Sequence, residues 1–252
     1  MATLTRHSAY SLRDPYSHRE LSDSMTLRIP STLEVRERID AIREEDYIIP
    51  SPSEKFPDGV RRINGADVKI TSKLALIGGF RISEIATKYS NNAESGNSSN
   101  TLKIWVEEHR DTGEEALRIQ VVTLKKNYPI LRDIGIPLDP YHESFSRDIL
   151  KAWEQADGNP CKVSRQDAWY VNRIAFDGYG YKVNRKLELK PAGNHFLRHM
   201  RAIELKQMQV GAEDRVSFFK WSAGSAGLNQ MIMTYSESDW FDYFPRLLRK
   251  KG

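Results

Sequence analysis

Apolar residues recur at helical spacing in several segments of the chain. In Ser31 to Asp46 they share one face among alternating charges, which predicts an amphipathic helix with Ser31 or Thr32 as its N-cap. From Ala66 to Ile77 the pattern is apolar on nearly all sides, as in a buried helix that Gly78-Gly79 ends. Helices are also predicted for a segment from Asp139 to the stretch at Asp157, for Ser164–Ile174, from His195 to near Gly211, for Leu228–Tyr235 and for Trp240–Leu248.

In the middle of the chain the spacing changes from helical to alternating. Three consecutive strands are predicted, over Thr101–Val106, Leu117–Leu124 and Arg132–Leu138. Asp111-Thr112-Gly113 is a turn sequence that joins the first two. The second and third flank a hairpin tip that carries Lys125 and Lys126, although two exposed turn lysines are also common without function.

The other segments lack periodicity. Residues 1–25 predict a flexible arm, and the proline- and glycine-containing stretch Ile49–Gly59 predicts a loop, as does the Asn/Ser/Gly-rich stretch Tyr89–Asn100. The chain as a whole therefore predicts one α+β domain over residues 26–252, mostly helical, with a small three-stranded antiparallel sheet.

Composition supports a packed globule, because 39% of the residues are hydrophobic and 10% are aromatic. The net charge is only +4, but basic residues gather in two regions. They are Lys182, Arg185, Lys186, Lys190, Arg198, Arg201 and Lys206, and near the C-terminus Arg246, Arg249, Lys250 and Lys251. Such clusters indicate either a nucleic-acid-binding surface or an ordinary solvated face.

The number of cysteines and the hydropathy of the chain exclude several classes of protein. Cys161 is the only cysteine, which excludes an intramolecular disulfide and a cysteine-rich metal site. No apolar run has the length of a membrane span, and the N-terminus lacks the apolar core of a signal peptide. We therefore expect a cytoplasmic protein that needs no membrane.

Two short motifs carry candidate chemistry. His195 and Arg198 are three residues apart, so they share one face near the start of their helix, where Asn194 is the expected N-cap. Free N–H groups and the helix dipole favour an anion there, although most such pairs are solvated surface. Arg81 follows the buried helix and the glycine pair directly. The simplest interpretation of Arg81 is a structural one, in which it forms a salt bridge with Glu84.

Taken in order along the chain, these motifs resemble the tyrosine recombinase, or phage-type integrase, family. Its first arginine box is similar to Gly79-Phe80-Arg81-Ile82-Ser83-Glu84, and its His-x-x-Arg-His box is similar to His195-Phe196-Leu197-Arg198-His199. Trp221, in Lys220-Trp221-Ser222, stands where the family has a histidine or tryptophan before its nucleophile. The resemblance covers about Ala66 to Tyr235 and implies an integrase-like catalytic domain, reminiscent of integrases of archaeal mobile elements.

The resemblance implies a role for each matching residue. Arg81 and Arg198 would bind the scissile phosphate, with His195 as the general base. Lys125 or Lys126 would protonate the leaving 5′-oxygen, and the two remain alternatives.

Trp221 would pack against the phosphate site, and Tyr235 would form the 3′-phosphotyrosyl link. Trp221 is more often a core residue, and the fourteen-residue interval to Tyr235 is wider than the family's, which leaves Tyr243 as an alternative nucleophile. Only about eighty residues precede Arg81, and in this respect the chain resembles an isolated catalytic domain.

The expected activity is metal-independent cleavage and rejoining of double-stranded DNA, as a homotetramer and without a cofactor. Two alternatives remain open: relaxation of DNA in the manner of a type IB topoisomerase, or DNA binding without cleavage. The tail Trp240–Gly252 is expected to dock either on a neighbouring protomer or on its own domain.

Overall fold

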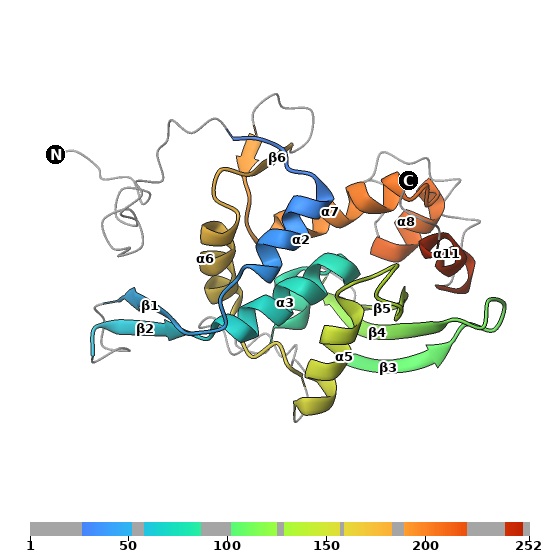
Figure 1. Cartoon of the computed structure of the whole chain (residues 1–252), viewed down its shortest axis with the longest axis horizontal. Helices are drawn as coiled ribbons and strands as arrows, with labels where there is room; N and C mark the ends of the chain where they lie inside the picture. The colour runs from blue at the N-terminus through green and yellow to red at the C-terminus, as the bar shows by residue number, and fades with distance from the viewer. Residues whose placement is uncertain are drawn as a thin grey trace.

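The computed structural model describes residues 27–51, 58–86, 102–124, 129–156, 159–182, 189–220 and 240–248 (Figure 1). Eight helices and small antiparallel sheets lie in these ranges, which confirms the predicted α+β class. The helices are α2 (Thr32–Asp40), α3 (Gly65–Gly78), α4 (Ile82–Ile85), α5 (Ser146–Gln155), α6 (Arg165–Ala175), α7 (Asn194–Gln207), α8 (Ala212–Phe219) and α11 (Trp240–Leu247). The strands are β1 (Tyr47–Pro50), β2 (Val60–Ile63), β3 (Lys103–Glu108), β4 (Glu115–Leu124), β5 (Pro129–Pro137), β6 (Gly180–Lys182) and β7 (Leu189–Pro191).

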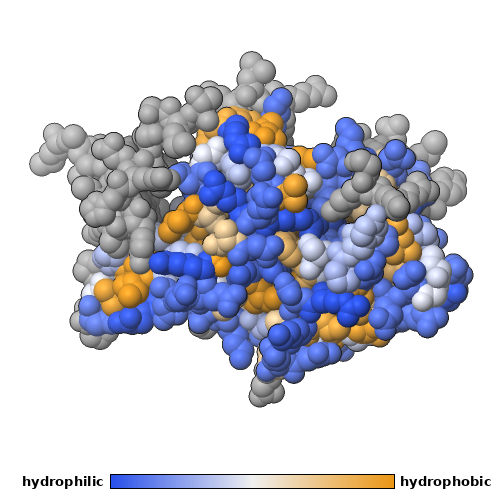
Figure 2. Space-filling model, in the orientation of Figure 1, coloured by the Kyte–Doolittle hydropathy of each residue, from blue (hydrophilic) through white to orange (hydrophobic). Residues whose placement is uncertain are grey.

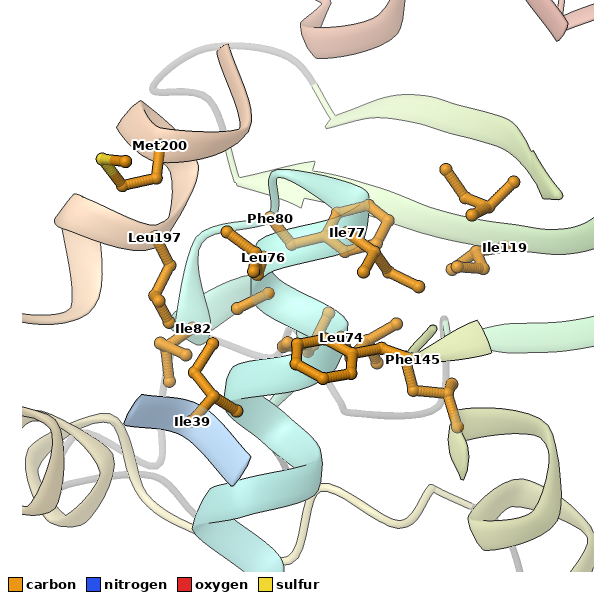
Figure 3. Packing of buried hydrophobic residues seen from close by; sticks show 14 of the residues in the cluster. Ile39, Leu74, Leu76, Ile77, Phe80, Ile82, Ile119, Phe145, Leu197 and Met200 are labelled. Atoms are coloured by element: carbon orange, nitrogen blue, oxygen red, sulfur yellow. The ribbon is translucent and has the colours of Figure 1, made fainter. Parts of the chain in front are cut away.

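Helix α3 lies at the centre of the fold and is buried along most of its length, as its sequence predicts (Figure 1). Asn64 caps its N-terminus by accepting a hydrogen bond from the backbone of Asp67. Figure 3 shows the side chains of α3 between α7 and the sheet, with Leu197 on one side and Ile119 on the other. Each buried Leu, Ile or Phe side chain contributes about 1.5–3 kcal/mol through the hydrophobic effect.

The end of α3 requires glycine for two separate reasons. Gly79 is its C-cap, with φ of +58°, a left-handed conformation that side chains disfavour. A Cβ atom on Gly79 would also lie 2.2 Å from the ring of Phe219. Gly78 is equally crowded, because its Cβ would meet the ring of Phe80. The chain therefore turns sharply at this pair and continues into Arg81 and α4.

The predicted three-stranded meander is confirmed, with the strand order β3-β4-β5. The pairing of β4 with β5 runs to Leu124 opposite Pro129, so the connection between them is residues 125–128. Inward residues of β5 alternate, and Arg132, Ile134 and Ile136 are all buried. The residues between them face the other side of the sheet.

Helix α11 covers that other side. Trp240 lies so close to Gly135 that a Cβ there would be 2.2 Å from its ring. Tyr243 accepts a hydrogen bond from the backbone N–H of Gly135, and the ring of His109 stacks on Phe244 with centroids 4.9 Å apart. Residues 240–248, the described part of the C-terminal tail, therefore pack on their own domain, which was one of the two expected alternatives.

Several predicted boundaries are wrong. Helix α2 ends at Asp40, and Ile49 and Pro50, the first two residues of the expected loop, belong to β1, which pairs with β2. These four-residue strands are too short for an alternating pattern to stand out. Helix α7 ends at Gln207, because Gly211 is the N-cap of a separate helix, α8. The predicted arm over residues 1–25 and the predicted helix Leu228–Tyr235 lie outside the described residues.

The visible surface is mixed in polarity. Figure 2 shows apolar residues in separate patches among hydrophilic ones on this face. None of the helices in the described ranges has the length and hydropathy needed to cross a membrane.

A buried cluster of four charges joins α2 to α7. Arg36 pairs with Glu143 at 2.5 Å and with Glu204 at 2.9 Å, and Arg201 pairs with the same two carboxylates. All four side chains are at most 8% exposed. Two positive and two negative charges compensate each other, so the cluster is neutral.

We expect Glu143→Gln to lower the free energy of unfolding by about 3 kcal/mol, because two buried arginines then share one carboxylate. Urea unfolding measures the loss. Arg62→Ala is the matched control, because Arg62 is 58% exposed and pairs with an exposed Asp58, so its loss should stay below about 1 kcal/mol. Equal losses in both variants would show that the cluster is solvated.

Candidate anion-binding site

Three of the predicted site residues come together where the end of α3 meets α7. Arg198 donates from Nη1 to the carbonyl oxygen of Gly79 at 2.5 Å, two residues before Arg81, and from Nη2 to that of Phe219 at 3.0 Å. His195 lies one turn before Arg198 on α7 and is exposed. Residues more than a hundred positions apart in the sequence thus form one site.

The charges of these residues act on one another. Although part of the His195 ring reaches solvent, the surrounding protein removes water from the rest of it. This desolvation, followed by the positive charges of Arg198 and Arg81, lowers the pKa of His195 below its ordinary value of 6.5. Burial also lowers the pKa of Arg198 to about 10, an effect that Glu84 opposes and Arg81 reinforces. At neutral pH the site therefore holds two charged guanidiniums and an uncharged imidazole that can accept a proton.

Arg81 makes the salt bridge that its spacing predicts. Its Nη1 lies 2.7 Å from Oε1 of Glu84, and its backbone N–H donates to the same carboxylate. The Glu84 side chain is fully buried, whereas the Arg81 side chain is 38% exposed. A salt bridge and a binding role are therefore compatible, because Glu84 orients a guanidinium that still reaches solvent.

The expected cap of α7 is wrong. Gly193 is the N-cap, without a side-chain hydrogen bond, and Asn194 is the first helical residue. The Asn194 side chain accepts from Asn172 at 3.1 Å and donates to the carbonyl of Arg165 at 2.8 Å. The Asn194 side chain thus fixes α7 against α6, and among the described residues no side-chain hydrogen bond caps the start of α7.

Two further residues beside His195 were not predicted. The ring of Tyr181 on β6 lies 6.3 Å from that of His195 and 5.3 Å from that of His199. Exposed Lys190 on β7 contributes to lowering the pKa of His195. The β6–β7 hairpin brings both residues to α7, and strands of three residues leave no pattern in the sequence.

Arg132 is the other unpredicted residue, and it lies directly behind the site. It is fully buried on β5 and donates to the carbonyls of Gly78, Gly79 and Phe218. The sequence holds a signal for it, because Arg132 occupies the same alternating register as Ile134 and Ile136. A charged residue on the buried face of a strand is unusual and needs a partner.

Four predicted residues, Lys125, Lys126, Trp221 and Tyr235, lie outside the described residues. The alternative nucleophile, Tyr243, is described and is unsuited to that role. Its side chain is 1% exposed, its hydroxyl accepts from the backbone of Gly135, and burial raises its pKa. A phenol enclosed by the sheet and α11 cannot reach a substrate, so Tyr243 is a core residue.

The site's chemistry follows from its donors. A tetrahedral anion can take charge-assisted hydrogen bonds from guanidiniums and from free N–H groups at the start of α7. In the described ranges no group of three or more His, Cys, Asp or Glu side chains is arranged to hold a metal ion.

Comparisons with protein-family models, curated proteins and solved structures find no match to this chain.

We expect His195 to titrate below 6.5 in NMR of the free protein, and Arg81→Gln to raise its pKa because a nearby positive charge is removed. The matched control is Arg110→Gln, which changes an arginine that is 73% exposed in the β3–β4 turn and should leave His195 unchanged. Identical titration of His195 with and without Arg81 would contradict the convergence of the two residues.

Proposed function

We propose that this chain is a site-specific DNA recombinase of the tyrosine recombinase (integrase) type, which cleaves and rejoins DNA through a covalent 3′-phosphotyrosyl intermediate. The observation that carries the proposal is the convergence of Arg81, His195 and Arg198 at one site with a positive balance of charge. The order of the motifs along the chain and the three-stranded sheet between them agree with the same function.

The two arginines suit the transition state of phosphodiester cleavage. Negative charge increases on the non-bridging oxygens as tyrosine attacks, and preorganised guanidiniums stabilise that charge more than the charge of the ground state. Two of the five N–H groups of Arg198 donate to backbone carbonyls, which fixes the orientation of its guanidinium. Glu84 orients Arg81 in the same manner.

Proton transfer is assigned to the residues around this pair. His195, uncharged at neutral pH, accepts the proton of the tyrosine hydroxyl. Lys125 or Lys126, in the connection between β4 and β5, donates a proton to the leaving 5′-oxygen. The covalent link conserves the energy of the broken bond, so religation needs neither a metal nor a cofactor.

Tyr235 is the proposed nucleophile, and Trp221 is proposed to pack against the phosphate. Both follow α8 in the sequence, and the carbonyl of Phe219, near the end of α8, accepts a hydrogen bond from Arg198.

The proposed partner is double-stranded DNA, bound by a homotetramer that holds two duplexes in the cytoplasm. Exposed Lys182 and Lys190 on the β6–β7 hairpin extend the positive charge beyond the site. Contacts of this kind hold the DNA backbone without selecting a sequence, so the target site is left to other residues.

We expect the wild type to form a covalent adduct with a randomised pool of nicked duplexes, because a nick lets the cleaved end diffuse away and traps the link. Peptide mass mapping should locate DNA on Tyr235, and Tyr235→Phe should form none. Tyr128→Phe is a matched control that should retain the adduct.

Other outcomes separate the rival functions. Binding of duplex without any adduct would leave a DNA-binding protein that does not cleave. An adduct together with relaxation of plasmids, but without exchange between two sites, would favour a topoisomerase.

We expect Arg81→Ala to reduce adduct formation by at least about a hundredfold, and Arg198→Ala likewise, while duplex affinity changes less than about threefold. Binding is spared because many other basic residues contact the backbone. Gel shift measures affinity, and circular dichroism must show that Arg198→Ala is folded, because Arg198 also binds two carbonyls. Losses of binding as large as the losses of cleavage would contradict the proposal that both arginines bind the scissile phosphate.

A further inference from the structure

Arg132 differs from most other buried arginines of the described chain in having only carbonyl partners. Arg36, Arg118 and Arg201 each form an ion pair with a carboxylate. Arg132 donates from Nε to the carbonyl of Phe218 at 2.5 Å, from Nη1 to Gly79 at 3.2 Å and from Nη2 to Gly78. These three bonds give each guanidinium nitrogen a partner, but none of the described residues pairs a carboxylate with its charge.

The surroundings of Arg132 exclude water. The residue is 0% exposed, and its guanidinium lies over three rings: Phe80 at 4.5 Å, Phe218 at 5.1 Å and Phe219 at 5.5 Å. Aromatic faces offset part of the cost of burying a cation. Burial, and next the charge of Arg198, lowers the pKa of Arg132, which is the direction expected for a charge that lacks a partner.

The carbonyls that Arg132 binds are the negative end of α3. Gly78 and Gly79 end a fourteen-residue helix whose dipole and free carbonyls would repel an anion at this place. Gly79 accepts from both Arg132 and Arg198, so two guanidiniums meet on one oxygen atom. A helix end that would disfavour phosphate is thereby made positive.

The charges around this helix end do not cancel. Arg81, Arg132 and Arg198 interact electrostatically with one another and with Glu84. Within the described part of the chain, three positive charges thus interact with one carboxylate, in contrast to the neutral cluster around Arg36. A surplus of buried positive charge is costly in the free protein and favourable once an anion binds.

We propose that Arg132 is a positioning residue of this anion site: a third guanidinium that never contacts the bound phosphoryl group but holds Gly79 and, through it, Arg198, and adds its own charge to the site. The proposal deepens the proposed function and rests on it for the identity of the anion as a DNA phosphodiester. The site's affinity for a small inorganic oxyanion tests Arg132 separately.

The experiment titrates inorganic sulfate, against chloride at matched ionic strength, into the full chain and its variants. The His195 imidazole resonances, assigned with His195→Gln, report binding. Wild type should bind sulfate, and Arg132→Gln, whose amide can still donate to a carbonyl, should bind it about tenfold more weakly because one nearby charge is lost. Arg132→Lys keeps the charge and should stay within about threefold of wild type at pH 6.

Arg118→Met is the matched control. Arg118 is also buried in this sheet, but it pairs with Glu107 and Asp133 and lies over Trp240 on the opposite face. Its loss should change sulfate affinity less than about twofold. Unchanged sulfate affinity in folded Arg132→Gln, an equal loss in Arg118→Met, or no sulfate binding by the wild type would each overturn the proposal.

Arg132→Lys provides a second measurement in case the neutral variant does not fold. A buried lysine loses its proton at a much lower pH than a guanidinium. The ratio of wild-type to Arg132→Lys sulfate affinity should therefore rise between pH 6 and pH 9, and comparison with wild type at each pH cancels the titration of His195 and His199. A constant ratio would show that Arg132 acts only by its shape.

The two proposals fail in different ways. Sulfate binding that depends on Arg132, in a chain that forms no DNA adduct, would support the anion site and overturn only the tyrosine chemistry. Formation of the adduct, together with a sulfate affinity that does not change in the Arg132 variants, would support the recombinase and overturn the role of Arg132.

Discussion

The C-terminal end of α3 is the point on which the rest of the structure depends. Its last carbonyls, at Gly78 and Gly79, accept hydrogen bonds from two buried arginines, one on β5 and one on α7. These bonds join the central helix to the sheet on one side and to the helix that carries His195 on the other (Figure 1). Only glycine permits this, because of the left-handed φ of Gly79 and the closeness of the rings of Phe80 and Phe219.

Buried arginines in this protein serve two different purposes. The cluster around Arg36 balances its charges, and it fixes α2 against α7. The cluster around Gly79 is left positive, with Glu84 as its only carboxylate partner among the interacting groups of the described chain. The first arrangement stabilises the fold, and the second is the basis of the proposed anion site. The same residue type thus has opposite electrostatic consequences, according to whether carboxylates accompany it.

The sequence predicted the long elements reliably. The buried helix that ends at Gly78, the meander of β3, β4 and β5 and the helix that begins at His195 each span enough residues for their spacing to be read. The β1–β2 and β6–β7 hairpins were missed because three or four residues cannot establish an alternation. Asn194 was misassigned for a different reason: an asparagine before a helix suits a cap locally, but Asn172 and the backbone of Arg165 compete for its side chain.

By itself the sequence determined which residues are candidates for the chemistry: an arginine after a glycine pair, and a histidine and arginine three residues apart. It also indicated that Arg81 would pair with Glu84, three residues later, and the structure has this salt bridge between the N-cap of α4 and its third residue. Only the tertiary structure decided that Arg81, His195 and Arg198 share a site, that Arg132 lies behind it and that Tyr243 is enclosed in the core. The physical reason is range: hydrogen bonding and side-chain periodicity act over a few neighbouring residues, whereas the meeting of α3, β5 and α7 depends on how whole elements pack.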